Sequence, residues 1–222
     1  MILNINWWKW LGILLVCYSI IAGMLGAVPA QPILHETIRN LYFHVTMWFA
    51  MMGLLMASVY YSIKQLGSNT SLHHDLRATH TAHVAMLLGT CGILTGSLWA
   101  RYTWGAWWTD DAKLNGVAAS MLFYLAYFVL RNSIDDYQKR ARIAAVYNIF
   151  CFVMLVVFIW VRPRLTDSLH PGNGGNPGFG KYDLDNNMRL VFYPAIIGWI
   201  LIAAWLVQLR VRTANLIASK DA

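Results

Sequence analysis

A cluster of tryptophans and carboxylates holds the residues whose types and spacing most clearly indicate chemistry. Trp104, Trp107, Trp108 and Asp111 stand at positions i, i+3, i+4 and i+7. On a helix these four positions form one stripe, so a short helix would present three indoles and a carboxylate together. Because tryptophan is large and costly to leave in water, such a cluster needs a surface to lie on, which lipid headgroups, a protein core or a flat ligand can provide. By itself the cluster favours an ordinary aromatic belt at a membrane boundary.

Two histidines, His44 and His170, are the candidate metal ligands. Two neutral imidazoles can bind haem iron axially, and tryptophans can stack on the porphyrin. Taken singly, His44 is more simply a hydrogen-bonded residue near a helix end, and His170 a solvated loop residue. The haem propionates would need cationic partners. Five cations are expected near the same surface: Arg39, Arg101, Lys113, Arg162 and Arg164.

The segments that must position these residues are long and apolar. Hydrophobic residues make up 58% of the 222 residues and charged residues only 12%, whereas soluble domains carry about 25% charge. Six runs approach the roughly 20 residues that a helix needs to cross a bilayer. We therefore predict an all-α integral membrane protein, a single domain over residues 1–222 with six transmembrane helices. The runs lie at about 10–28, 41–63, 82–100, 116–131, 143–161 and 190–209.

The connections between these runs decide which candidate residues share a face. If all six runs cross the membrane, loops one, three and five lie on one side. They include a tryptophan-rich loop at about 101–115 and a long loop at about 162–189. The opposite side carries 10 of the 17 Lys and Arg residues, which predicts that both termini face the cytoplasm. His44, the tryptophan cluster and His170 then meet at the outer face, and that coincidence favours a haem site.

The remaining signals are assigned structural roles. The polar stretch 64–81 is predicted to be a solvated loop on the cytoplasmic side, together with its three histidines. The cysteines lie singly inside apolar runs without a C-x-x-C pair, so a thiol redox site is not expected. The net charge of +7 is spread over the loops and does not gather on one face, so no nucleic-acid partner is expected. The residues concerned are His73, His74, His80, Cys17, Cys91 and Cys151.

The ordered motifs resemble those of the tryptophan-rich haem-handling membrane proteins, and within them the cytochrome c maturation protein C family. The family pattern W-G-x-W-W-x-W-D-A-R-L is matched by residues 104–114, except that Asp110 replaces the last tryptophan and Lys113 the arginine. The stretch from Arg39 through Tyr42 to His44 is similar to the one before the family's first histidine ligand. Leu169-His170 and Asp135-Asp136 match as well, so the likeness covers nearly the whole chain.

The resemblance implies a specific role for each candidate residue. The family binds b-type haem non-covalently on the outer face of the bacterial inner membrane, with His44 and His170 as axial ligands. Trp104, Trp107, Trp108 and Asp111 would form the haem platform, and Arg39 and Lys113 would contact propionates or hold the loop. A carboxylate at Asp110 cannot stack on porphyrin, and it would repel a propionate unless it faces away or pairs with Lys113 or Arg101.

The resemblance also implies partners and excludes catalysis by the chain itself. The haem would be delivered to a periplasmic haem chaperone for cytochrome c maturation. ATP-binding-cassette subunits and a small membrane subunit would accompany the protein. Three alternatives stay open: a cytochrome c synthase-type haem ligase subunit, a b-type membrane cytochrome and a small-solute transporter. Runs two to six have no histidine in the middle, which argues against the haem ligase subunit. Both candidate ligands lie at one rim, whereas a b-type cytochrome would bury its haem between helices. No charged residue lies deep in any run, which argues against a transporter.

Overall fold

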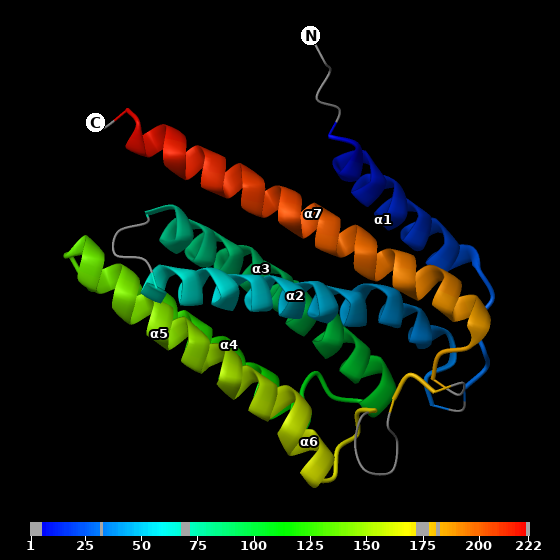
Figure 1. Cartoon of the computed structure of the whole chain (residues 1–222). Helices are drawn as coiled ribbons and strands as arrows, with labels where there is room; N and C mark the ends of the chain where they lie inside the picture. Colours follow the sequence, from blue (N-terminus) through cyan, green and yellow to red (C-terminus); the bar gives the residue numbers. More distant parts are fainter. Residues whose placement is uncertain (1–5, 32, 68–71, 172–177, 181–182, 221–222) are drawn as a thin grey trace.

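Long apolar helices build most of the chain in the computed structural model, which describes residues 6–31, 33–67, 72–171, 178–180 and 183–220 (Figure 1). The helices are α1 (Trp7–Leu25), α2 (Leu41–Gly67), α3 (Leu72–Trp104), α4 (Ala112–Asn132), α5 (Tyr137–Val156), α6 (Arg162–Leu165) and α7 (Asn186–Ala218). A 3-10 helix, η1 (His35–Asn40), precedes α2, and a π-helical turn, η2 (Val157–Val161), joins α5 to α6. No strand occurs among the described residues, so the predicted all-α class is confirmed.

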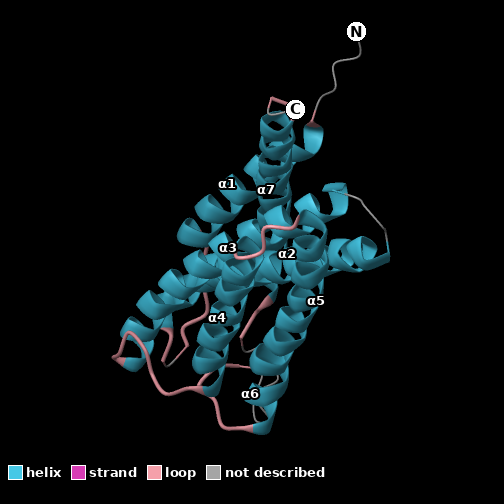
Figure 2. Cartoon of the chain, turned by 90° about the vertical axis from the view of Figure 1, so that its left-hand side faces the viewer, coloured by secondary structure: helices cyan, strands magenta, loops and turns pink. Residues whose placement is uncertain are grey.

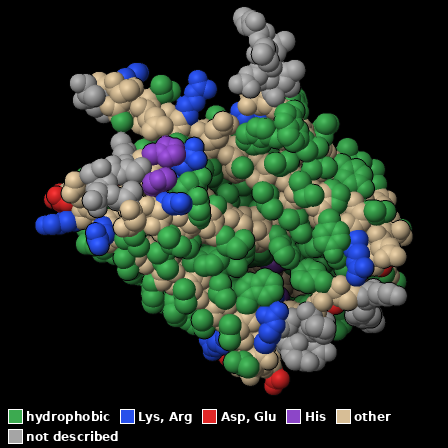
Figure 3. Space-filling view, viewed as in Figure 1, with side chains coloured by type: hydrophobic (Ala, Val, Ile, Leu, Met, Phe, Trp, Pro, Cys, Tyr) green, Lys and Arg blue, Asp and Glu red, His purple; other side chains and the backbone are tan. Residues whose placement is uncertain are grey.

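Within the part of the chain that the structure describes, six helical segments are long and apolar enough to cross a membrane, as the sequence predicts. They span residues 7–25, 35–67, 73–104, 112–132, 137–165 and 186–218. Figure 3 shows hydrophobic side chains over most of one face of the bundle, with basic side chains toward its edges. Such a surface suits helices that meet lipid directly.

The third helix begins about ten residues earlier than predicted. Residues 72–81, expected to be part of a solvated loop, form the first turns of α3. One side of these turns is polar because it meets polar partners inside the bundle. Arg131 at the end of α4 donates two hydrogen bonds to Asp75, of 2.6 and 2.5 Å, and the Ser58 hydroxyl of α2 donates to the carbonyl of Ala78. Part of the polarity that suggested a loop therefore belongs to an ion pair buried between helices.

Helix α2 lies at the centre of the bundle and packs against α3, α5 and α7. Helices α1 and α7 run side by side in both views (Figures 1 and 2). Glycines allow this close approach: a Cβ atom built at Gly12 would lie 3.0 Å from Leu201 Cβ, and one at Gly198 would lie 3.0 Å from Leu15 Cβ. Small residues on facing helices are typical of helix pairs in membranes.

The connections that follow α1, α3 and α6 gather at one end of the bundle (Figures 1 and 2). That end lies away from the first turn of α1 and the last turn of α7. The Trp99 indole of α3 donates to Thr37 Oγ1 of η1 at 3.0 Å, which ties the first connection to the third helix. The fold thus brings together the three segments that carry the candidate residues.

Candidate functional site

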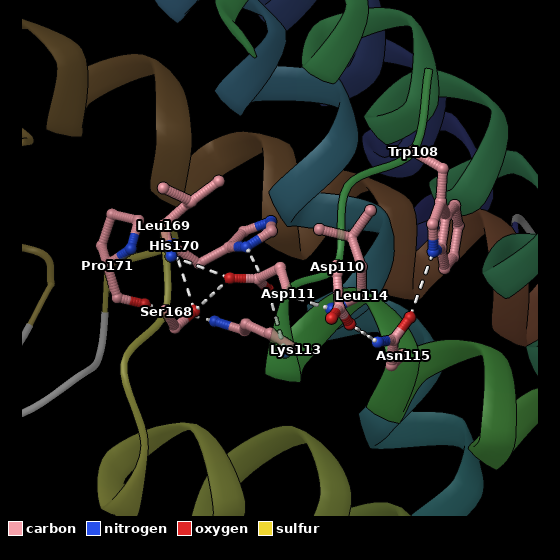
Figure 4. A network of polar contacts seen from close by, with 10 residues as sticks. All are labelled: Trp108, Asp110, Asp111, Lys113, Leu114, Asn115, Ser168, Leu169, His170 and Pro171. Carbon is pink, nitrogen blue, oxygen red and sulfur yellow. Dashed lines mark hydrogen bonds and ion pairs between the residues drawn. The ribbon is translucent and has the colours of Figure 1, made fainter. Parts of the chain in front are cut away.

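The site is organised around the carboxylate of Asp111, which joins the start of α4 to the segment after α6 (Figure 4). Asp111 is the N-cap of α4, and its Oδ1 accepts hydrogen bonds from the backbone N–H groups of Lys113 and Leu114 at 2.9 and 3.1 Å. The first turn of a helix leaves such N–H groups without helical partners, and an aspartate satisfies them well. Its Oδ2 accepts from Ser168 Oγ at 2.9 Å and from Leu169 N–H at 2.8 Å. A buried side chain therefore fixes two loops together.

The same carboxylate orients His170. The His170 Nδ1–H donates to Asp111 Oδ1 at 3.0 Å, and the imidazole stands edge-on to Trp104, with ring centroids 4.9 Å apart. A carboxylate on one imidazole nitrogen fixes the tautomer and directs the other nitrogen, Nε2, toward a metal. The geometry matches that of a histidine metal ligand held by an outer carboxylate.

His44 is anchored in the same manner, by a carbonyl. It lies in the first turn of α2 and faces α3, where its Nδ1–H donates to the carbonyl of Gly92 at 2.9 Å. Thr95 Oγ1 is 3.3 Å from the same nitrogen. The imidazole stands edge-on to Trp48 and Trp99, at centroid distances of 6.1 and 5.9 Å. His44 thus lies in the first turn of α2, and His170 lies in the segment after α6, which reaches the same end of the bundle (Figures 1 and 2).

The predicted helical stripe of tryptophans is wrong. Trp104 is the last residue of α3, and Gly105 follows it with a φ of +78°, a left-handed conformation that ends the helix. Trp107 and Trp108 lie in the bent segment after it and are 58% and 41% exposed. Asp111 therefore does not line up with the indoles but contacts His170 from the start of the next helix.

A pair of imidazoles limits the metal chemistry open to this site. Among the residues that the structure describes, no three His, Cys, Asp or Glu side chains gather in a way that could hold a metal ion. Two histidines, each beside an indole, would suit a metal whose remaining ligands come from a flat cofactor, as in haem.

Comparison with known proteins agrees with this chemistry. A family model described as Heme exporter protein C matches residues 2–222. The chain belongs to the heme exporter protein C family. The heme exporter protein C of Escherichia coli K12 is 24% identical over 200 residues, which cover 88% of this chain and 77% of that protein. The resemblance seen in the motifs is thereby confirmed.

Two other relatives match shorter stretches. The heme exporter protein C of Bradyrhizobium diazoefficiens is 34% identical over 115 residues, covering 50% of this chain and 41% of that protein. A cytochrome c biogenesis protein CcsA of Prochlorococcus marinus is 37% identical over 100 residues, covering 45% of this chain and 31% of that protein. This chain therefore aligns with less than half of the length of either relative.

Asp110, where the heme exporter family pattern has tryptophan, joins a local chain of hydrogen bonds (Figure 4). The Asn115 side-chain amide donates to Asp110 Oδ1 at 2.7 Å, and the Trp108 indole N–H donates to Asn115 Oδ1 at 3.1 Å. Lys113 Nζ donates to the carbonyl of Pro171 at 3.3 Å, and Arg101 donates to the carbonyl of Gly105. Asp110 thus accepts a hydrogen bond from the Asn115 amide, where a contact with Lys113 or Arg101 was expected. The same Asn115 side chain links Asp110 to Trp108.

Arg39 secures the first connection. Its guanidinium pairs with Glu36 at 2.7 Å and donates to the carbonyls of Gly23 and Gly26 at 2.9 and 2.6 Å. Of the two roles expected for Arg39, these contacts favour holding the loop over binding a propionate.

Sequence reasoning missed the residues of α3 that receive His44. A Cβ atom built at Gly96 would lie 2.4 Å from His44 Cε1, and one at Gly92 would lie 2.7 Å from Trp48 Cε2. The glycines therefore make room for the imidazole and for the indole beside it. Their G-x-x-x-G spacing inside an apolar run was the available signal for a close approach.

The charge of Asp111 is stabilised by its partners. Burial alone would raise the pKa of Asp111, but the hydrogen bond and charge of His170, with the donors Leu169 N–H and Ser168 Oγ, hold that pKa well below its usual range. Because the pKa is lowered on folding, the ionised carboxylate stabilises the protein above the ordinary carboxyl range. This contribution is lost only as the pH falls from about 4 into the more acid range.

We expect Asp111→Asn to lower the free energy of unfolding by about 2 kcal/mol, because asparagine can still cap α4 but cannot provide charged acceptors. The measurement is thermal unfolding of the purified protein. Asp185→Asn is the matched control, since Asp185 caps α7 by accepting from Met188 N–H at 2.8 Å, outside this site. Equal destabilisation by the two variants would contradict a special role for the pair formed by Asp111 and His170.

Proposed function

We propose that this protein binds a b-type haem through His44 and His170 and passes it to a periplasmic haem chaperone during cytochrome c maturation. One observation carries the proposal: each imidazole has its Nδ1 committed to a fixed acceptor, Gly92 O or Asp111 Oδ1. This arrangement directs Nε2 of each ring toward a ligand, which is how histidine ligands are usually held. Membership in a family named for heme export supports the same reading.

The surrounding residues would hold and shield the haem. Trp104, Trp107 and Trp108 would offer indole faces to the porphyrin, and Asp111 would act through His170. Lys113 is the proposed partner of a propionate, since it stands two residues after Asp111 and its Nζ donates to the carbonyl of Pro171, next to His170. The iron would supply the coordination chemistry, while the chain would bind and orient the haem and perform no chemical turnover of its own.

We expect Trp107→Ala combined with Trp108→Ala to lower haem occupancy several-fold, because two exposed indoles that would cover the porphyrin are removed. Haem is quantified per purified chain, and membrane insertion is checked by fractionation. The matched control is Trp7→Ala with Trp10→Ala, two exposed tryptophans of α1 far along the chain from the site. An unchanged haem content in the double variant would show that Trp107 and Trp108 do not bind haem and are ordinary tryptophans of a membrane interface.

We further propose that the chain is one domain of the bacterial inner membrane, with both termini in the cytoplasm and the haem site on the periplasmic face. The excess of basic residues at the opposite end supports this orientation. Topology reporters fused after residue 109 and after residue 179 should both give a periplasmic signal. A cytoplasmic signal from either fusion would contradict the proposal, because the tryptophan-rich loop and the loop that carries His170 would not both lie on the periplasmic side.

ATP-binding-cassette subunits and a small membrane subunit are the proposed membrane partners, and transfer to the chaperone is the step to test. Haem-loaded protein mixed with a purified periplasmic haem chaperone should lose its haem to the chaperone. The similarity to a cytochrome c biogenesis protein CcsA supports a second candidate, a haem ligase subunit. Covalent attachment of haem to an apocytochrome peptide without the chaperone would favour the ligase.

A further inference from the structure

A groove with basic residues on its wall lies at the end of the bundle opposite to the proposed haem site. Helices α1, α2, α3 and α7 enclose it, with a volume of about 640 Å³. Its walls are mainly apolar and include Trp8, Leu54 and Val207, while Arg77 and Arg212 bring two guanidinium groups. In Figure 1 the C-terminal part of α7 passes above the start of α3, and Figure 3 shows basic side chains and histidines on this part of the surface.

Arg77 is held on the groove wall by Tyr61. Its Nη1 donates to the Tyr61 hydroxyl at 2.9 Å, and the guanidinium lies 5.4 Å from the centroid of the Tyr61 ring. Arg212 lies on the facing helix, α7, and is exposed. No acidic side chain is among the described residues that line the groove. Two positive charges therefore stand on an apolar wall without a lining carboxylate to neutralise them.

We propose that this groove binds an anionic phospholipid. Its negative headgroup would lie between Arg77 and Arg212, and an acyl chain would follow the apolar wall past Leu54 and Val207. Basic pockets between transmembrane helices recognise anionic headgroups in this way, and each Lys or Arg near the surface contributes about 1 kcal/mol. A zwitterionic lipid would bring a cation toward the arginines and bind more weakly. This proposal stands independently of the haem site.

The test is lipid binding by the full-length protein in a non-ionic detergent, measured by native mass spectrometry. The probes are phosphatidylglycerol and phosphatidylcholine with the same acyl chains. Phosphatidylglycerol should bind at least about tenfold more tightly, because both arginines act on its headgroup. Arg77→Gln and Arg212→Gln should each weaken its binding about fivefold. Arg210→Gln removes the same charge from α7 outside the groove lining and should leave binding unchanged.

A second variant tests the apolar part of the groove without changing any charge. Ala204 lines the apolar part of the groove, so Ala204→Leu should reduce the retention of both lipids while the circular dichroism spectrum stays unchanged. Equal affinity for the two lipids would overturn the proposal. So would equal effects of Arg212→Gln and Arg210→Gln. Displacement of phosphatidylglycerol by haem, one for one, would assign the groove to haem instead.

Discussion

His170→Ala is expected to abolish the low-spin spectrum of the haem-loaded protein and to lower haem affinity at least about 100-fold. Loss of an outer partner of a ligand already costs about 10–100-fold in metal affinity, and loss of the ligand itself should cost more. The fold should survive, because Asp111 keeps its bonds to Ser168, Leu169 and the first turn of α4. His44→Ala should change the spectrum in the same way, because His44 is the second proposed ligand. Optical titration of the purified variants with haem measures both quantities.

The control is a histidine from the other end of the bundle. His73 is exposed at the start of α3, so His73→Ala should leave haem affinity and spectrum unchanged. If His170→Ala kept the wild-type spectrum, His170 would not be a ligand, and the contact with Asp111 would be only structural.

Gly96→Ala is the second change with a large expected effect, because one methyl group would displace His44. The added Cβ would lie 2.4 Å from His44 Cε1, so the imidazole must swing away from the carbonyl of Gly92. We expect haem affinity to fall about tenfold or more, since the ring loses its orienting partner. Global stability should change little, because alanine favours the helix by about 1 kcal/mol over glycine, offsetting part of the crowding.

Gly53→Ala provides the matched control for that helix effect. Gly53 lies in α2, and a Cβ atom there would meet nothing within 4 Å. It should raise the melting temperature slightly and leave haem affinity at the wild-type level. If both glycine variants bound haem like the wild type, the close approach of His44 to α3 would have no role in the site.

The sequence was sufficient to predict the all-α class and the family. His170 and Asp111, which the fold brings into contact, could be predicted to share an end because each stands in a recognisable motif and because alternate loops of a helical bundle share an end. The six apolar runs gave the number of membrane-crossing helices and therefore which loops share an end. A long apolar run is strong evidence for such a helix in a chain with so few charged residues.

The features that escaped prediction depend on contacts between distant residues or on single backbone angles. Residues 72–81 look like a loop by polarity, but Asp75 is paired with Arg131, 56 positions away. The helical spacing of the tryptophans suggested a stripe, yet the left-handed conformation of Gly105 ends α3 at Trp104. The tie between Asp110 and Asn115 depends on the course of the chain after that break.

The most direct test of the proposed function is the low-temperature electron paramagnetic resonance spectrum of the purified wild-type protein loaded with ferric haem. Two imidazole ligands make the iron low-spin, so we predict a rhombic low-spin signal from one haem per chain. A high-spin axial signal, or no stoichiometric binding of haem, would contradict ligation by His44 and His170.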